Sequence, residues 1–163
     1  CIGCLACKIK NGKSLGCCAV NDDLKPVFDK ICTCDGLILG SPIYFGDITA
    51  MLQAFWERLI FQHLNYDDYS KPFVSGKLKT AFIYTMNAPE TFYEDLVKKY
   101  EAILDSYFKY TGTVSSAETL QINDYSRYHM ASFNEAERIK RRKEVFPVDC
   151  QKAYDLGKLI TID

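Results

Sequence analysis

The apolar run Leu37–Leu39, bracketed by glycines and followed by a long amphipathic segment, constrains the fold of this chain more than any other feature. A short run of this kind predicts a strand buried on both faces of a parallel sheet, and Ser41–Pro42 are expected to end it. After a loop that extends to Gly46, Asp47 is a candidate helix cap. Apolar residues then recur at helical spacing, which predicts an amphipathic helix: Ile48, Met51, Leu52, Phe55, Trp56, Leu59 and Ile60.

The same order of strand and helix is repeated along the chain. Lys79–Thr85 holds a second β-prone run, and Asn87–Glu90 has the chemistry of a helix start. That helix is expected to end near Gly112, before a third strand over Val114–Ile122. One or two final helices, divided around Pro147, are expected to direct three residues to the core: Leu156, Leu159 and Ile160. Alternating strands and helices predict the α/β class, with a doubly wound parallel sheet.

Composition limits the number of domains and the class of partner. A chain of 163 residues with 48% hydrophobic residues can fill one core, so we expect one domain over 1–163, with a cysteine-rich loop at 1–25 and strand-helix repeats at 35–163. A net charge of −1 argues against nucleic acid and anionic membranes as partners, and the basic run Lys140–Lys143 is interpreted as a solvated helix face. No apolar run reaches the roughly 20 residues of a membrane span, and no secretory signal is visible. A cytoplasmic location is therefore expected.

Two loops are candidates for a ligand site, because ligands of open parallel sheets bind at the carboxyl ends of the strands. Ser41–Gly46 follows the first strand and offers Tyr44 and Phe45 to a flat conjugated ligand, while Gly46 permits close approach. Thr85–Ala88 follows the second strand and offers a hydroxyl and an amide. The alternative is that Tyr44 and Phe45 are surface or interface aromatics.

The run Asp35–Gly46, continued by Ala54–Arg58, resembles the central signature of the flavodoxin-like NADPH-dependent FMN reductase family. Upstream, Cys1–Lys8 together with Cys18 and Asp22–Leu24 resembles the cysteine-rich segment of its iron-sulfur flavoprotein branch. Downstream, Phe146–Pro147 and Ala153–Lys158 resemble the final helix of such proteins. The resemblance implies a flavodoxin-like fold.

The resemblance also implies a function. An FMN-dependent NAD(P)H oxidoreductase would pass hydride or electrons from the nicotinamide to a quinone-like, azo, nitro or flavin acceptor, and it would often be a homodimer. FMN would supply the hydride chemistry, so no protein acid or base is assigned, and His63 and His129 are expected to be structural or solvent-facing. The implied FMN-binding residues are Ser41, Pro42, Ile43, Tyr44, Phe45, Gly46, Thr85, Met86 and Asn87.

The chain departs from the family at its N-terminus, where no segment resembles the first strand and the phosphate-binding loop of the family. We therefore expect an N-terminally truncated flavodoxin-like sheet that binds FMN weakly or not at all. Without the first strand, Leu37–Leu39 becomes an exposed edge that favours association, unless Cys1–Lys25 folds over it.

The cysteines leave three alternatives open. Cys1, Cys4 and Cys7, with Cys17 or Cys18 as fourth ligand, resemble a [4Fe–4S] binding run; the others are a structural zinc and reduced thiols in a loop. Three further cysteines are expected to pack as small apolar side chains: Cys32, Cys34 and Cys150. The competing functions are accordingly an iron-sulfur flavoprotein electron carrier, with Cys1, Cys4, Cys7 and Cys18 as ligands, and a non-enzymatic fragment.

Overall fold

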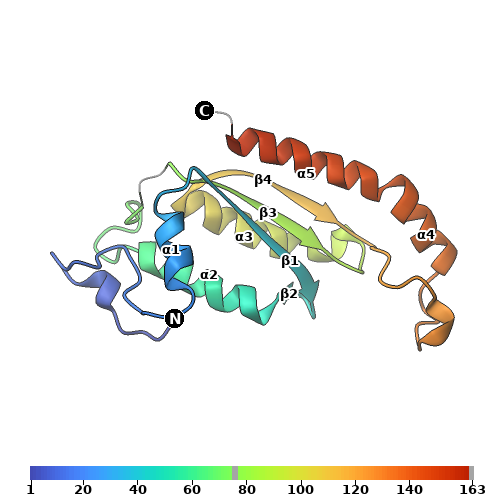
Figure 1. The fold of residues 1–163 in the computed structure, drawn as a ribbon, viewed down its shortest axis with the longest axis horizontal. Helices are drawn as coiled ribbons and strands as arrows, with labels where there is room; N and C mark the ends of the chain where they lie inside the picture. The colour runs from blue at the N-terminus through green and yellow to red at the C-terminus, as the bar shows by residue number, and fades with distance from the viewer. Residues whose placement is uncertain (75–76, 162–163) are drawn as a thin grey trace.

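The computed structural model describes residues 1–74 and 77–161, in which strands alternate with helices (Figure 1). The described elements are η1 (Ala6–Lys8), α1 (Lys25–Ile31), β1 (Gly36–Tyr44), β2 (Asp47–Ile48), α2 (Ala50–His63), β3 (Lys79–Thr85), η2 (Glu90–Tyr93), α3 (Glu94–Tyr107), β4 (Lys109–Ser116), η3 (Tyr125–Arg127), α4 (Glu135–Glu144) and α5 (Phe146–Thr161). The sheet has the order β2-β1-β3-β4, in which β1, β3 and β4 are parallel and β2 is antiparallel. The predicted α/β class and parallel sheet are confirmed, and the architecture is that of a flavodoxin-like fold.

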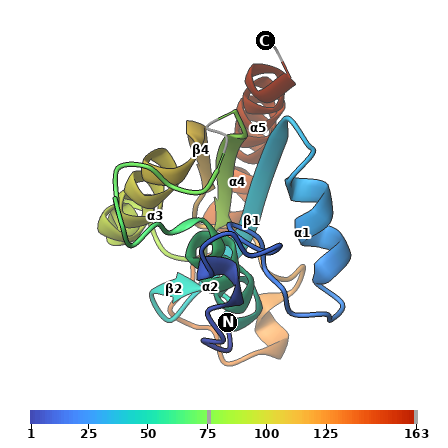
Figure 2. The same ribbon diagram turned by 90° about the vertical axis from the view of Figure 1, so that its left-hand side faces the viewer.

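Helices cover both faces of the sheet (Figures 1 and 2). α2 and α3 pack on one face, where the larger core gathers around Phe82, Tyr100 and Leu104. α1 joins this layer, because Phe28 stacks on Phe55 of α2 with ring centroids 5.2 Å apart. α5 covers the other face through a smaller cluster formed by Ala81, Val114, Leu156 and Ile160. Among the helices of the described residues, none combines the length and the apolarity needed to cross a membrane.

Strand β1 is longer and less buried than the sequence predicts. Ser41–Pro42 do not end it, because Pro42 continues the strand in register with Thr85 of β3. Proline is tolerated in an edge strand, where one row of N–H groups has no partner to serve. Side chains along β1 alternate between the core and solvent, so Leu39 is buried whereas Ile38 is 45% exposed. The prediction of burial on both faces was therefore wrong for β1.

The free edge of β1 fits the expectation that this strand lies at the border of the sheet. In the part of the chain that the structure describes, β2 pairs with this edge only at Ile43 and Tyr44, and no strand pairs with it over Gly36–Pro42. The cysteine-rich segment makes its hydrogen bonds to α2. The backbone groups of Gly36–Pro42 on that side thus remain open to a further strand.

Three element boundaries differ from the prediction. Thr49, not Asp47, caps α2 by accepting a hydrogen bond from the Leu52 N–H, while the Asp47 carboxylate accepts from the Tyr100 hydroxyl at 2.7 Å. α3 ends at Tyr107 and not near Gly112, which lies inside β4 beside a register shift. The third strand, β4, spans Lys109–Ser116 and not the predicted Val114–Ile122.

The C-terminal helices are as predicted in number. They meet around Pro147, which occupies the first turn of α5. Leu156 and Ile160 are buried as expected, but Leu159 is exposed.

Candidate functional site

The β1–β2 hairpin presents two aromatic side chains at the carboxyl edge of the sheet. Its two-residue turn has positive φ at both positions, 51° at Phe45 and 86° at Gly46, which is the conformation that suits a tight hairpin. Tyr44 is 64% exposed and Phe45 is fully exposed. A bulky residue held at positive φ is strained, so the turn displays Phe45 at an energetic cost.

The residues that precede the turn support it from beneath. Ser41 and Ile43 are buried, and the Ser41 hydroxyl accepts a hydrogen bond from the Thr49 N–H at 3.0 Å and donates one to the Pro42 carbonyl at 2.7 Å. Ser41 thereby links the strand to the start of α2. Of the predicted ring-binding loop, only Tyr44, Phe45 and Gly46 project from the sheet.

The second predicted loop lies beside the first, as the rule for strand ends requires. Thr85 is exposed next to Pro42, with which it is in register. Met86 points into the core and its backbone bonds to Ser116 and Thr119, so its side chain serves packing. The Asn87 Oδ1 is buried and has no hydrogen-bond partner within residues 1–74 and 77–161.

Helix α4 holds the loops that follow β3 and β4, which the sequence analysis did not foresee. Arg138 Nη2 donates to the Asn87 carbonyl at 2.9 Å, and Arg141 Nε donates to the Ala117 carbonyl at 2.8 Å. The basic run was predicted to be solvated, and this is confirmed for Lys140, Arg142 and Lys143 but wrong for Arg141. The sequence feature that could have indicated these contacts is the three-residue spacing of Arg138 and Arg141, which places both side chains on one helix face.

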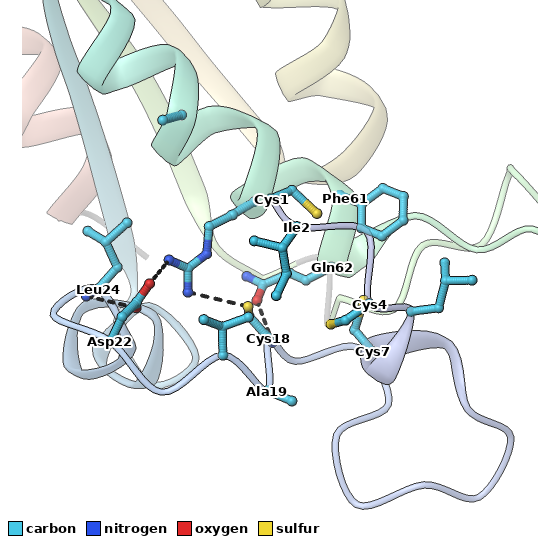
Figure 3. Close-up of a pocket in the computed structure, with 14 residues that line it drawn as sticks. Cys1, Ile2, Cys4, Cys7, Cys18, Ala19, Asp22, Leu24, Phe61 and Gln62 are labelled. Atoms are coloured by element: carbon cyan, nitrogen blue, oxygen red, sulfur yellow. Dashed lines mark hydrogen bonds and ion pairs between the residues drawn. The ribbon is translucent and has the colours of Figure 1, made fainter.

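A second candidate site is a cavity of about 250 Å³ between the N-terminal segment and α2 (Figure 3). The four predicted cluster ligands all line it: Cys1, Cys4, Cys7 and Cys18. Helix α2 contributes Ala54, Arg58, Phe61 and Gln62 to the lining. The cavity lies beside the carboxyl half of α2, whereas the hairpin adjoins the amino end of that helix (Figure 1). The structure thus brings each predicted set of residues together, in two separate places.

The cysteine-rich segment is fastened to α2 by polar contacts. Lys8 Nζ donates to the carbonyl oxygens of Phe61, Gln62 and Leu64, which lie at the carboxyl end of the helix. The Cys18 N–H donates to Gln62 Oε1 at 2.9 Å. These contacts hold the cysteines against the helix without any disulfide among the described residues.

Arg58 reaches from α2 across to the segment. It is only 7% exposed, and its Nη1 pairs with Asp22 Oδ2 at 2.6 Å while its Nη2 donates to Cys18 Sγ at 3.3 Å. Its guanidinium carbon lies 4.9 Å from the centroid of the Phe28 ring. The hydrogen bond from Arg58 holds the pKa of the Asp22 carboxyl below its usual range.

The cysteine cavity fits a cluster in its donor set. Four thiols and one buried cation suit an anionic cluster held by thiolates. In the described residues, no three side chains of His, Cys, Asp or Glu lie close enough to hold one metal ion. A cubane binds each thiolate through a different iron atom, so its ligands stand farther apart than those of a single ion.

Three further cysteines and both histidines lie outside the lining of the cavity. Cys32, Cys34 and Cys150 are exposed, so the prediction that they pack as small apolar side chains was wrong. His63 is buried against Phe108 and within 3.4 Å of the Phe73 carbonyl, and burial lowers its pKa to about 4. His63 is structural and His129 is exposed, as predicted.

Part of the chain is similar in sequence to known flavoproteins. Residues 5–85 match the family model for NADPH-dependent FMN reductase. An iron-sulfur flavoprotein of Methanocaldococcus jannaschii is 43% identical over 58 residues, which are 36% of this chain and 28% of that protein. An iron-sulfur flavoprotein of Methanosarcina thermophila is 30% identical over 60 residues, which are 37% of this chain and 29% of that protein. An iron-sulfur flavoprotein of Clostridioides difficile is 41% identical over 58 residues, which are 36% of this chain and 24% of that protein. The matched segment spans less than a third of each relative.

Proposed function

Because residues 5–85 belong to the NADPH-dependent FMN reductase family, we propose that this chain is part of a flavin-dependent oxidoreductase that uses FMN. One observation carries the proposal: two exposed aromatic side chains, Tyr44 and Phe45, stand at the carboxyl edge of a parallel sheet beside the end of β3. That edge is where sheets of this architecture bind their ligands.

Each residue at this edge has a distinct part in the proposed site. Tyr44 and Phe45 offer ring faces to the isoalloxazine, and Gly46, with no atom within 4 Å of the place of a Cβ, leaves the turn open to close approach. Thr85 offers a hydroxyl, and Arg138 fixes the backbone of Asn87. Bound FMN would supply the hydride chemistry.

The proposal extends to the substrates and the assembly. NAD(P)H is the proposed hydride donor, and the proposed acceptor is a quinone-like, azo, nitro or free flavin molecule, which would approach from the solvent side of the hairpin. We also propose a homodimer, which the open backbone edge of Gly36–Pro42 supports.

Replacing Tyr44 with alanine should weaken flavin binding without loss of the fold. A stacked aromatic contact contributes roughly 0.5–1.5 kcal/mol, so we expect the dissociation constant to rise roughly two- to tenfold. The measurement is a fluorescence titration with FMN and with riboflavin, carried to millimolar concentration, together with thermal unfolding.

The matched control is Tyr154→Ala on α5, because Tyr154 is 62% exposed and Tyr44 is 64% exposed. This variant should bind flavin as the unchanged protein does. If Tyr44→Ala and Tyr154→Ala bind flavin equally well, the ring site is misplaced.

A second candidate function is an iron-sulfur flavoprotein that carries electrons through a cluster at Cys1, Cys4, Cys7 and Cys18. The shared cavity of these four thiols is the observation that favours it. Anaerobic reconstitution with iron and sulfide should yield a brown protein with both elements bound. Cys4→Ser should lose this colour and Cys150→Ser, on exposed α5 surface, should keep it; an equal loss in both variants would contradict the assignment.

A further inference from the structure

Arg58 is a cation in a place where a lone cation is costly. Its side chain is 8% exposed, and its partner Asp22 sits at the rim with 42% exposure. The Nε is buried and has no hydrogen-bond partner in the ranges that the structure describes. Leaving a buried charged donor unpaired costs free energy, so the contacts of the two Nη atoms have to offset the burial of this cation.

On the side of the cavity, Arg58 contacts a cysteine sulfur. Nη2 donates to Cys18 Sγ at 3.3 Å, and Cys18 shares the cavity with Cys4 and Cys7. A guanidinium has several fixed donors, so it can bind the rim carboxylate and the thiol at once. Arg58 thus links the surface of the segment to the interior of the cavity.

Arg58 also orders the segment that bears Cys18. The segment is held at its first part by Lys8, on the carbonyls that end α2, and at its later part by Arg58, with Gln62 between them. Loss of Arg58 therefore removes the anchors of Asp22 and of the Cys18 thiol, while the contacts made by Lys8 and Gln62 persist. This separates the two anchors experimentally.

We infer that Arg58 is the positioning residue of the cysteine cavity, which places Cys18 and, by its charge and its hydrogen bond to sulfur, raises the reduction potential of a cluster bound there. The inference rests on the second candidate function. Reduction adds negative charge to a cluster, and hydrogen bonds to its sulfurs and nearby positive charge favour the reduced form. The exposed Asp22 carboxylate has the opposite sign and should act in the opposite direction.

The test compares Arg58→Gln with Asp22→Asn in the reconstituted full chain, by redox titration of the visible absorption. Arg58→Gln should shift the potential to lower values, and Asp22→Asn should leave it unchanged or raise it. A purely structural role would move both variants in the same direction, since both lose the same ion pair. Equal potentials in Arg58→Gln and the unchanged chain would overturn the inference.

A second readout needs no cluster. Hydrogen exchange of the cluster-free chain should be about tenfold or more faster over residues 17–24 in Arg58→Gln, because the segment loses the hydrogen bonds that tie Asp22 and the Cys18 thiol to α2. Exchange over residues 5–8 should not change. Unchanged exchange over 17–24 would refute the positioning role.

Two further outcomes keep the tests separate. If the unchanged chain takes up no iron or sulfide, the second candidate function fails, while the exchange experiment still decides whether Arg58 positions the segment. If Arg58→Gln does not fold, Arg58→Lys replaces it: lysine keeps the charge but cannot bind Asp22 and Cys18 together. That variant should keep a potential near that of the unchanged chain and show faster exchange over 17–24; a potential as low as that expected for loss of the charge would contradict the inference.

Discussion

The free energy of unfolding should fall as the pH is lowered from about 6.5 towards about 4, and His63 should cause much of the fall. Burial lowers the pKa of His63 to about 4 in the folded protein, whereas an unfolded histidine titrates near its ordinary value of about 6.5. Between these values the unfolded chain binds a proton that the folded protein does not, so acid favours unfolding. The loss amounts to roughly 3 kcal/mol when the pH reaches the folded pKa.

Denaturant unfolding of His63→Gln across this pH range measures the effect. Glutamine does not ionise, so the variant should lack this part of the pH dependence, although its stability at neutral pH can be lower. His129→Gln is the matched control, because His129 is exposed, and it should show the slope of the unchanged protein. Parallel slopes for His63→Gln and the unchanged protein would mean that His63 is accessible to protons in the fold.

Gly36→Ala should destabilise the protein by roughly 1–3 kcal/mol, the usual cost of forcing an extra methyl group into a packed core. A Cβ at Gly36 would lie 2.1 Å from Ile160 Cγ2. That methyl group belongs to a β-branched side chain with restricted rotation, and Ile160 is buried in α5. The end of the helix would therefore have to move away from β1.

Gly40→Ala in the same strand is the matched control. The nearest atom to its Cβ would be the Ile83 carbonyl oxygen at 3.9 Å, an ordinary contact, so its stability should be unchanged or up to about 1 kcal/mol higher. In the double variant Gly36→Ala/Ile160→Ala, the loss should be smaller than the sum of the two single losses. Additive losses would show that Ile160 is not the source of the strain.

Helices and strands were predicted best where the local sequence pattern is compatible with only one kind of structure. The apolar periodicity of α2 and the β-prone run Lys79–Thr85 both appear as predicted. The extent of β1 was not predictable from Pro42 alone, because proline stops a central strand but is tolerated at an edge. Whether β1 is an edge depends on residues that pair with it, and these lie far away in the sequence.

The boundary between α3 and β4 shows the same limit. Apolar residues up to Phe108 fit the helical pattern, and Gly112 was interpreted as the helix end. Gly112 instead has φ 154° within β4, where a residue without a side chain accommodates the register shift between β3 and β4. A glycine that ends a helix and one that sits in an irregular strand cannot be distinguished locally.

For the candidate site, strand ends were predictable and long-range partners were not. Tyr44 and Phe45 lie where the rule for parallel sheets places a ligand. The contacts of Arg58 with Asp22 and of Arg138 with Asn87 join residues 36 and 51 positions apart. No periodicity signals such contacts, because they depend on how the helices pack.

Helix α2 fixes the distance between the hairpin and the cysteine cavity. Its amino end adjoins Ser41 through Thr49, and its later turns carry Arg58 and Gln62. At about 1.5 Å per residue, Arg58 lies roughly 12 Å along the helix axis from Ala50. Helix α2 therefore acts as a rigid spacer, so that local movement of the hairpin or of the cysteine segment leaves the separation between the two ends of the helix unchanged.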